Sequence, residues 1–101
     1  MNEDKLRATA EHGRRFREWC EGPGGLYDVF SAVERNYADT LFASNIEDAV
    51  LREKICHRVA ALRDIRRVMQ EAITAGRSAE ATIKALSELE AKTKRARRAP
   101  A

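Results

Sequence analysis

The sequence predicts an all-α protein built around an antiparallel helical hairpin, and two observations support this fold class. Apolar residues recur at spacings of three and four along most of the 101 residues, which is the periodicity of amphipathic helices. Gly and Pro, the strongest helix breakers, are concentrated in one short stretch, residues 21–25. A chain of this length forms one domain at most, so we expect a small helical bundle in a single domain.

The first predicted element is an N-terminal helix over residues 1–20. Asn2 is a favourable N-cap, and Glu3 and Asp4 follow in the first turn, where the helix dipole favours acidic side chains. The sequence EGPGG then forms a Pro/Gly hinge at residues 21–25, because Pro restricts the residue before it and Gly tolerates positive φ angles. The first helix can therefore be directed differently from the rest of the chain.

The hairpin is predicted from two long amphipathic segments, residues 26–43 and 46–75. Ser44 and Glu47 match a capping box at the start of the second segment, and Gly76 suits a left-handed residue just after its end. A connection this short makes the two helices antiparallel neighbours. Their facing apolar stripes predict a shared core of Phe30, Val33, Tyr37, Leu41, Ile55, Val59 and Leu62.

A separate C-terminal helix is predicted to follow, with Ser78 as its N-cap, so that the folded domain covers residues 1–91. No apolar stripe continues beyond Leu89. Residues 92–101 are strongly basic and end near Pro100, which predicts a basic flexible tail.

The apolar face of the long second segment is wider than one neighbouring helix can cover. We expect the C-terminal helix or a second subunit to cover the stretch from Ile65 to Ile73, since large exposed apolar stripes are unusual on monomers. The residues predicted to form a partner or oligomer interface are Ile65, Val68, Met69, Ile73, Ile83 and Leu86.

Nothing in the sequence resembles a catalytic or cofactor site. Cys56 and His57 are adjacent and would point about 100° apart on a helix, and the three or four ligands of a zinc site are missing. Cys20 and Cys56 are expected to be semi-buried apolar residues in a cytoplasmic protein. We therefore expect no enzyme activity, no cofactor, no metal, no small-molecule substrate and no membrane association.

Clusters of basic residues leave room for an anionic partner. The net charge of +3 resides mainly at the C-terminus, where five basic residues follow one another without an acid. A basic run after a helix is as often a solubilising end as an arm that contacts phosphates. The residues predicted to bind nucleic acid or an acidic partner are Arg63, Arg66, Arg67, Lys92, Lys94, Arg95, Arg97 and Arg98.

Residues 26–86 resemble a group of small helical proteins encoded by tailed bacteriophages. The similarity rests on an aromatic pair near the start, a third aromatic residue, an acid followed by LRE at the entry to the long helix, and an Ala-Gly-basic exit followed by Ala. These positions are Tyr27, Phe30, Tyr37, Asp48, Leu51, Arg52, Glu53, Ala75, Gly76, Arg77 and Ala79. The resemblance implies a phage protein that works through protein contacts, such as a head or packaging accessory component, and assigns no catalytic residue.

Three functional hypotheses remain open at this level. The first is a non-enzymatic helical interaction or assembly protein, a homo-oligomer located in the host cytoplasm or in a virion. The second is a nucleic-acid-binding protein that uses the arginine clusters and the basic tail. The third is a small phage-encoded inhibitor that docks on a nucleic-acid-handling complex of the host.

Overall fold

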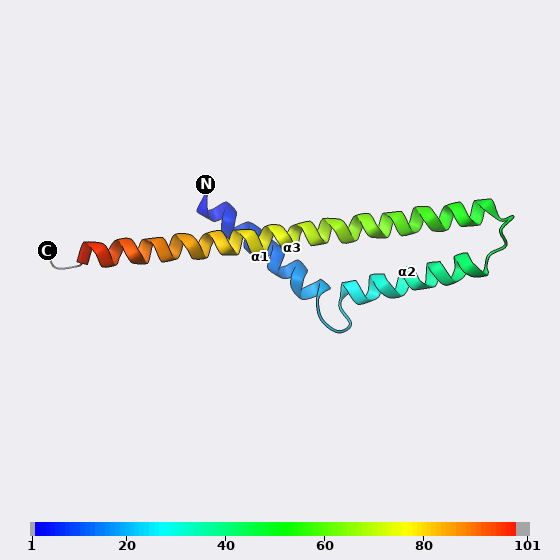
Figure 1. The fold of residues 1–101 in the computed structure, drawn as a ribbon, viewed down its shortest axis with the longest axis horizontal. Helices are drawn as coiled ribbons and strands as arrows, with labels where there is room; N and C mark the ends of the chain where they lie inside the picture. Colours follow the sequence, from blue (N-terminus) through cyan, green and yellow to red (C-terminus); the bar gives the residue numbers. More distant parts are fainter. Residues whose placement is uncertain (1, 99–101) are drawn as a thin grey trace.

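The chain is all-helical in the computed structural model, which describes residues 2–98. Within these residues it contains three helices and no strand: α1 (Glu3–Cys20), α2 (Leu26–Ala43) and α3 (Ala49–Arg98). Figure 1 shows α2 beside the first half of α3 and running in the opposite direction, while α1 crosses α3 near its middle.

The start of α1 agrees with the prediction. The side-chain oxygen Oδ1 of Asn2 accepts a hydrogen bond from the backbone N–H of Asp4 at 2.9 Å, so Asn2 is the N-cap. Met1 lies outside the described residues. The helix ends at Cys20, and the N–H of Glu21 still bonds to the carbonyl oxygen of Arg17.

Each glycine of the hinge has its own structural reason. Gly22 and Gly24 have φ angles of 104° and 75°, a region that other residues rarely adopt. Gly25 is the N-cap of α2, and a Cβ added there would lie 2.7 Å from the carbonyl oxygen of Cys20. Asp28 accepts a hydrogen bond from the N–H of Gly24 and holds the corner closed. The hinge therefore turns the chain sharply between α1 and α2.

The predicted capping box between α2 and α3 is not formed. Ser44 ends α2 instead, because its hydroxyl donates to the carbonyl oxygen of Leu41 at 2.6 Å. Helix α3 begins at Ala49, three residues later than predicted, and the Asp48 carboxylate accepts a hydrogen bond from the N–H of Leu51. Asp48 is thus in the N-cap position that the sequence analysis gave to Ser44.

The predicted end of the long helix at residue 75 is wrong, and so is the separate C-terminal helix. Helix α3 continues through Gly76 and Ser78 without interruption to Arg98. Gly76 is used for close packing rather than as a helix stop, because its Cα lies against Gly13 of α1. Residues 92–98, predicted as part of a flexible tail, are helical here, and Pro100 lies outside the described residues.

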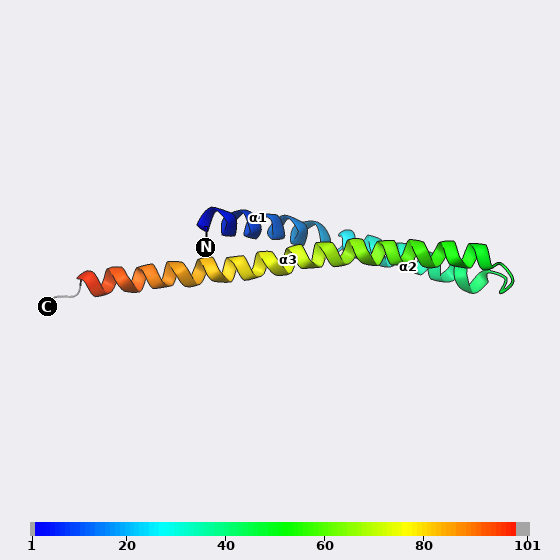
Figure 2. The same ribbon diagram turned by 90° about the horizontal axis from the view of Figure 1, so that it is seen from above.

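The molecule is an extended rod, not the compact bundle that the sequence suggested. It measures 84 × 27 × 17 Å, and its radius of gyration is 22.3 Å, whereas a compact domain of this length would have about 13 Å. The two views in Figures 1 and 2 show the C-terminal part of α3 projecting beyond the other helices. Of the predicted core between α2 and α3 only Ile55 is buried, and α2 has no buried residue at all.

Candidate interaction surfaces

Helices α1 and α3 cross at close range through small residues. Ala10, Gly13, Gly76 and Ala79 are all buried there. A Cβ added to Gly13 would lie 2.6 Å from both the carbonyl oxygen of Ala72 and the Cα of Gly76. The two backbones can approach this closely only because neither glycine carries a side chain. Gly13, which weakens α1 as an isolated helix, is what permits α1 to dock.

A small apolar core lies next to this crossing. It consists of Cys20, Met69 and Ile73. The partly buried side chains that pack around it are Phe16 of α1 and Leu26, Tyr27 and Phe30 of α2. The thiol of Cys20 is 3.6 Å from the sulfur of Met69, and its burial raises the pKa of the thiol. Met69 and Ile73 were predicted to lie at an interface between chains. That placement is wrong, because α1 and the start of α2 cover both residues within one chain.

Ion pairs and hydrogen bonds connect the helices around this core. Arg77 of α3 pairs with Glu21 of the hinge at 3.0 Å. Arg66 donates to the carbonyl oxygen of Tyr27 and to the hydroxyl of Ser31, and its guanidinium lies 5.8 Å from the centre of the Tyr27 ring. Arg66 therefore joins α2 to α3, which speaks against its predicted role in binding an anionic partner.

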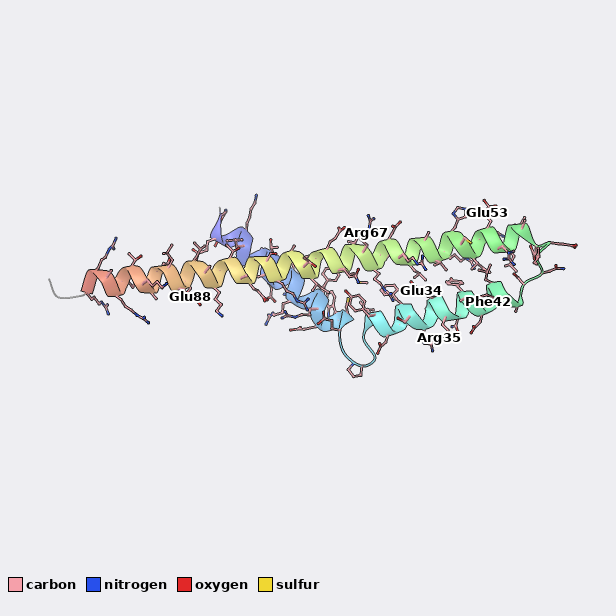
Figure 3. All side chains as sticks on the ribbon, in the orientation of Figure 1. Glu34, Arg35, Phe42, Glu53, Arg67 and Glu88 are labelled. Atoms are coloured by element: carbon pink, nitrogen blue, oxygen red, sulfur yellow. The ribbon has the colours of Figure 1, made fainter. Side chains whose placement is uncertain are left out.

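The other basic residues of the predicted anion-binding set do not form one surface. Arg67 is exposed and pairs with Asp64 at 3.5 Å. Figure 3 shows Arg67 projecting from the side of α3 that faces away from α2, whereas Arg63 lines the space between the two helices. The five basic residues between Lys92 and Arg98 lie at the opposite end of α3 from Arg63 and Arg67. All five are exposed on the last two turns of the helix.

An open groove runs between α2 and the first half of α3. Its volume is about 780 Å³. Apolar and charged side chains alternate along it: Ser31, Glu34, Arg35, Tyr37, Ala38, Leu41, Ile55, Cys56, Val59, Ala60, Arg63 and Asp64. Glu34 points into the space between the helices in Figure 3, and its Oε1 atom is buried without a hydrogen-bond partner. The groove thus combines apolar side chains with a buried acceptor that has no hydrogen-bond partner.

Large apolar side chains are also exposed at both ends of the rod. At the turn that joins α2 to α3, Phe42 and Ile46 are 88% and 84% exposed. On the projecting end of α3, Leu86 and Leu89 are 42% and 61% exposed. Of the predicted interface residues, Ile65 and Val68 are half exposed, and Ile83 is partly buried.

Sequence reasoning missed the apolar turn and the groove acid. Phe42 and Ile46 flank a polar loop and fall off the main stripe of α2, and two large apolar residues around a turn are the signal that could have revealed them. Glu34 carried no signal, because an acid beside an apolar stripe usually lies in solvent.

Three further features of the described residues bear on the sequence predictions. Within residues 2–98 no three His, Cys, Asp or Glu side chains are grouped so that they could hold a metal ion. Cys56 is exposed rather than semi-buried. None of the three helices is both long and apolar enough to cross a membrane.

Comparison with known proteins identifies no similar protein. No family model, no curated protein and no solved structure matches the chain.

Proposed function

We propose that the chain is a non-enzymatic helical assembly protein that works as a homo-oligomer. The observation that supports this proposal most strongly is the large accessible surface area of the chain. The chain exposes 8000 Å² of accessible surface, whereas a folded monomer of 11.4 kDa would expose about 5,800 Å². The excess of about 2,200 Å² is larger than the roughly 800 Å² that each partner buries in a typical stable complex.

The composition of this surface supports association. The exposed side chains include aromatic and branched apolar residues on all three helices, among them Trp19, Phe42 and Leu89. Exposed apolar surface that is distributed along a rod and lies beside an open groove is typical of subunits that complete their cores by association.

The direct test is size-exclusion chromatography with light scattering over a range of protein concentrations. A homo-oligomer gives an integral multiple of 11.4 kDa that dissociates on dilution. A mass of 11.4 kDa at every concentration would contradict the proposal. We further propose that such an assembly belongs to a phage head or its packaging apparatus, and electron microscopy of virions labelled on this chain tests that location.

Nucleic-acid binding is a second candidate, and one observation favours it. None of the ion pairs found within residues 2–98 includes a residue beyond Glu80, so the five basic residues of 92–98 are available to phosphates. If all five contact phosphates, the slope of log affinity against log salt should flatten by about 4 to 5 when the chain is cut after Ala91. The same slope for both proteins would exclude these residues from the contact.

A further inference from the structure

The C-terminal part of α3 is a long helix without a partner in its own chain. Residues 77–98, here called the arm, amount to about 33 Å of helix at 1.5 Å per residue. Only the beginning of the arm is covered, where Ala79 packs against α1 and Glu80 pairs with Arg17. Figures 1 and 2 show the rest extending away from α1 and α2. Most helical stability in proteins comes from packing of an apolar face rather than from helix propensity, so we expect the arm to lie on a surface.

One face of the arm carries an apolar stripe. Leu86, Leu89 and Thr93 are spaced at i, i+3 and i+7, so they share a face, and all three are exposed. Ala91 lies on the opposite face, because two residues along a helix correspond to a rotation of about 200°. The stripe is therefore one-sided, as expected for a helix that packs on a single surface.

The groove between α2 and α3 has matching dimensions. Helix α2 has 18 residues and is about 27 Å long, close to the free length of the arm. The apolar side chains of the groove could cover the apolar stripe of the arm, which has no partner in its own chain. These side chains are Tyr37, Leu41, Ile55 and Val59. The arm cannot reach the groove of its own chain. The arm and the groove lie at opposite ends of the straight helix α3, on either side of the α1 crossing.

The charges of the two ends of the rod are complementary. The α2–α3 turn and its flanks carry Asp39, Glu47 and Asp48, and no basic residue occurs between Asp39 and Arg52. The end of the arm carries five basic residues and no acid between Lys92 and Arg98. An antiparallel arrangement of two chains brings these opposite charges together, and a parallel one places like charges side by side.

We propose that two copies associate antiparallel about a two-fold axis near the middle of α3, and that the arm of each copy lies in the α2–α3 groove of the other. This inference rests on the proposed homo-oligomer and names its partner and surface. A two-fold dimer uses the same pair of surfaces twice, so one arm and one groove per chain are sufficient. It explains why α3 is almost three times as long as α2.

The register follows from the ends of α3. Placing the axis midway between Ala49 and Arg98 sets Thr93 of one chain within a turn of Cys56 of the other. Cys56 is exposed and lines the groove. The same register places the basic end of the arm beside the acidic turn.

Disulfide trapping tests this register. In the full-length chain, Thr93→Cys should form a covalent dimer with Cys56 of the second copy under mild oxidation, and replacing Cys56 with Ser should abolish it. Ala91→Cys is the matched control, because that thiol faces away from the groove and should form little dimer. Equal trapping at residues 91 and 93, or trapping that persists without Cys56, would overturn the proposal.

Charge reversal tests the same contact without a covalent bond. Lys94→Glu combined with Arg97→Glu should raise the dissociation constant by about tenfold or more, and Asp39→Lys combined with Glu47→Lys should do the same. All four changes in one chain should restore an affinity within a few-fold of the original. Asp48 is left unchanged because it caps α3. Lys5→Glu with Arg7→Glu, on the exposed start of α1, is the control and should leave the affinity unchanged.

The outcomes separate this inference from the function on which it rests. A wild-type monomer at all concentrations would overturn both. An oligomer that the arm reversals leave unchanged, or one that they weaken and the variant with all four changes does not restore, would leave the assembly function standing and overturn the arm-in-groove contact. Arm reversals that abolish DNA binding while the dimer persists would also overturn it and identify the arm as a nucleic-acid contact.

Discussion

Replacing Gly13 with Ala should loosen the docking of α1 on α3, although alanine favours a helix. In the interior of a helix, Gly→Ala adds about 1 kcal/mol of stability. The new Cβ would lie 2.6 Å from the oxygen of Ala72 and from the Cα of Gly76, and both are backbone atoms that cannot rotate away. The helices would have to separate by almost 1 Å to reach ordinary contact.

The expected net effect is a loss of stability. Overpacking of this kind costs about 1–3 kcal/mol, and the separation also exposes part of Met69 and Ile73, each of which gains about 1.5–3 kcal/mol from full burial. After the gain in helix propensity is subtracted, Gly13→Ala should lower the free energy of unfolding by about 1–2 kcal/mol.

Thiol labelling measures this effect directly. Cys20, the last residue of α1, is 1% exposed and packs against Met69 of α3. Cys56 is exposed within one chain and should react at once in the diluted monomer, so it serves there as an internal standard. Gly13→Ala should speed the labelling of Cys20 by about five- to thirtyfold under conditions where opening is reversible. Urea unfolding followed by the fluorescence of Trp19, the only tryptophan, gives the free energy independently.

A double variant tests the same contact between Gly13 and Gly76. Once Gly13→Ala has separated the helices, Gly76→Ala should cost much less than it does alone, because a Cβ there meets the same contact at 2.7 Å. If Gly13→Ala instead stabilises the protein by the full helix-propensity gain and leaves Cys20 protected, the close crossing does not exist.

Three further predictions concern a cap, a bridging side chain and a buried thiol. In urea titrations of the diluted monomer, Asp48→Ala should lower the free energy of unfolding by about 1 kcal/mol, while Glu47→Ala changes it little, because only Asp48 caps α3. Arg66→Met should cost about 1–2 kcal/mol in thermal unfolding through the lost bonds to Tyr27 and Ser31, whereas Arg63→Met, which removes an exposed charge, should be nearly neutral. Burial raises the pKa of the Cys20 thiol above its ordinary value of 9.0, so the folded state favours the protonated thiol. The stability that this preference contributes is complete below pH 9.0 and is lost as the pH rises through the folded pKa. Urea titrations in this alkaline range should therefore show a steeper loss for the wild type and for Cys56→Ala than for Cys20→Ala.

The sequence predicted those parts of the fold that local signals determine. The apolar spacing located α1 and α2 almost to the residue, and the Asn2 cap and the Pro/Gly hinge were identified from residue chemistry alone. These features depend on neighbours within a turn or two, so the information is present in a short window.

Several errors arose where packing between distant segments overrides a local signal. Gly76 has the residue type of a helix end, but it serves the approach of α1, sixty-three positions earlier in the chain. Met69 and Ile73 carried the correct signal of burial, but a stripe on one helix does not show which element covers it. Arg66 read as a surface cation because its hydrogen bonds to Tyr27 and Ser31 depend on the placement of α2.

The groove could be predicted only in part. Residues from both predicted stripes line the groove, but the distance between the two helices was not accessible from the pattern. Val33, Tyr37 and Leu41 remain only partly buried because α2 does not close onto α3. Helical periodicity gives the direction of a side chain and not the distance to the facing helix.

The most direct test of this account is the mass of the chain in solution, compared with that of Leu86→Glu combined with Leu89→Glu. Both leucines are exposed on the arm, so the variant should keep the helicity of the isolated chain. Light scattering should give twice 11.4 kDa for the wild type and 11.4 kDa for the variant at the same concentration, with unchanged circular dichroism per residue once both are diluted to monomer. A wild type that stays at 11.4 kDa, or a variant that keeps the mass of the wild-type dimer, would contradict the proposal that the arm of one copy completes the groove of another.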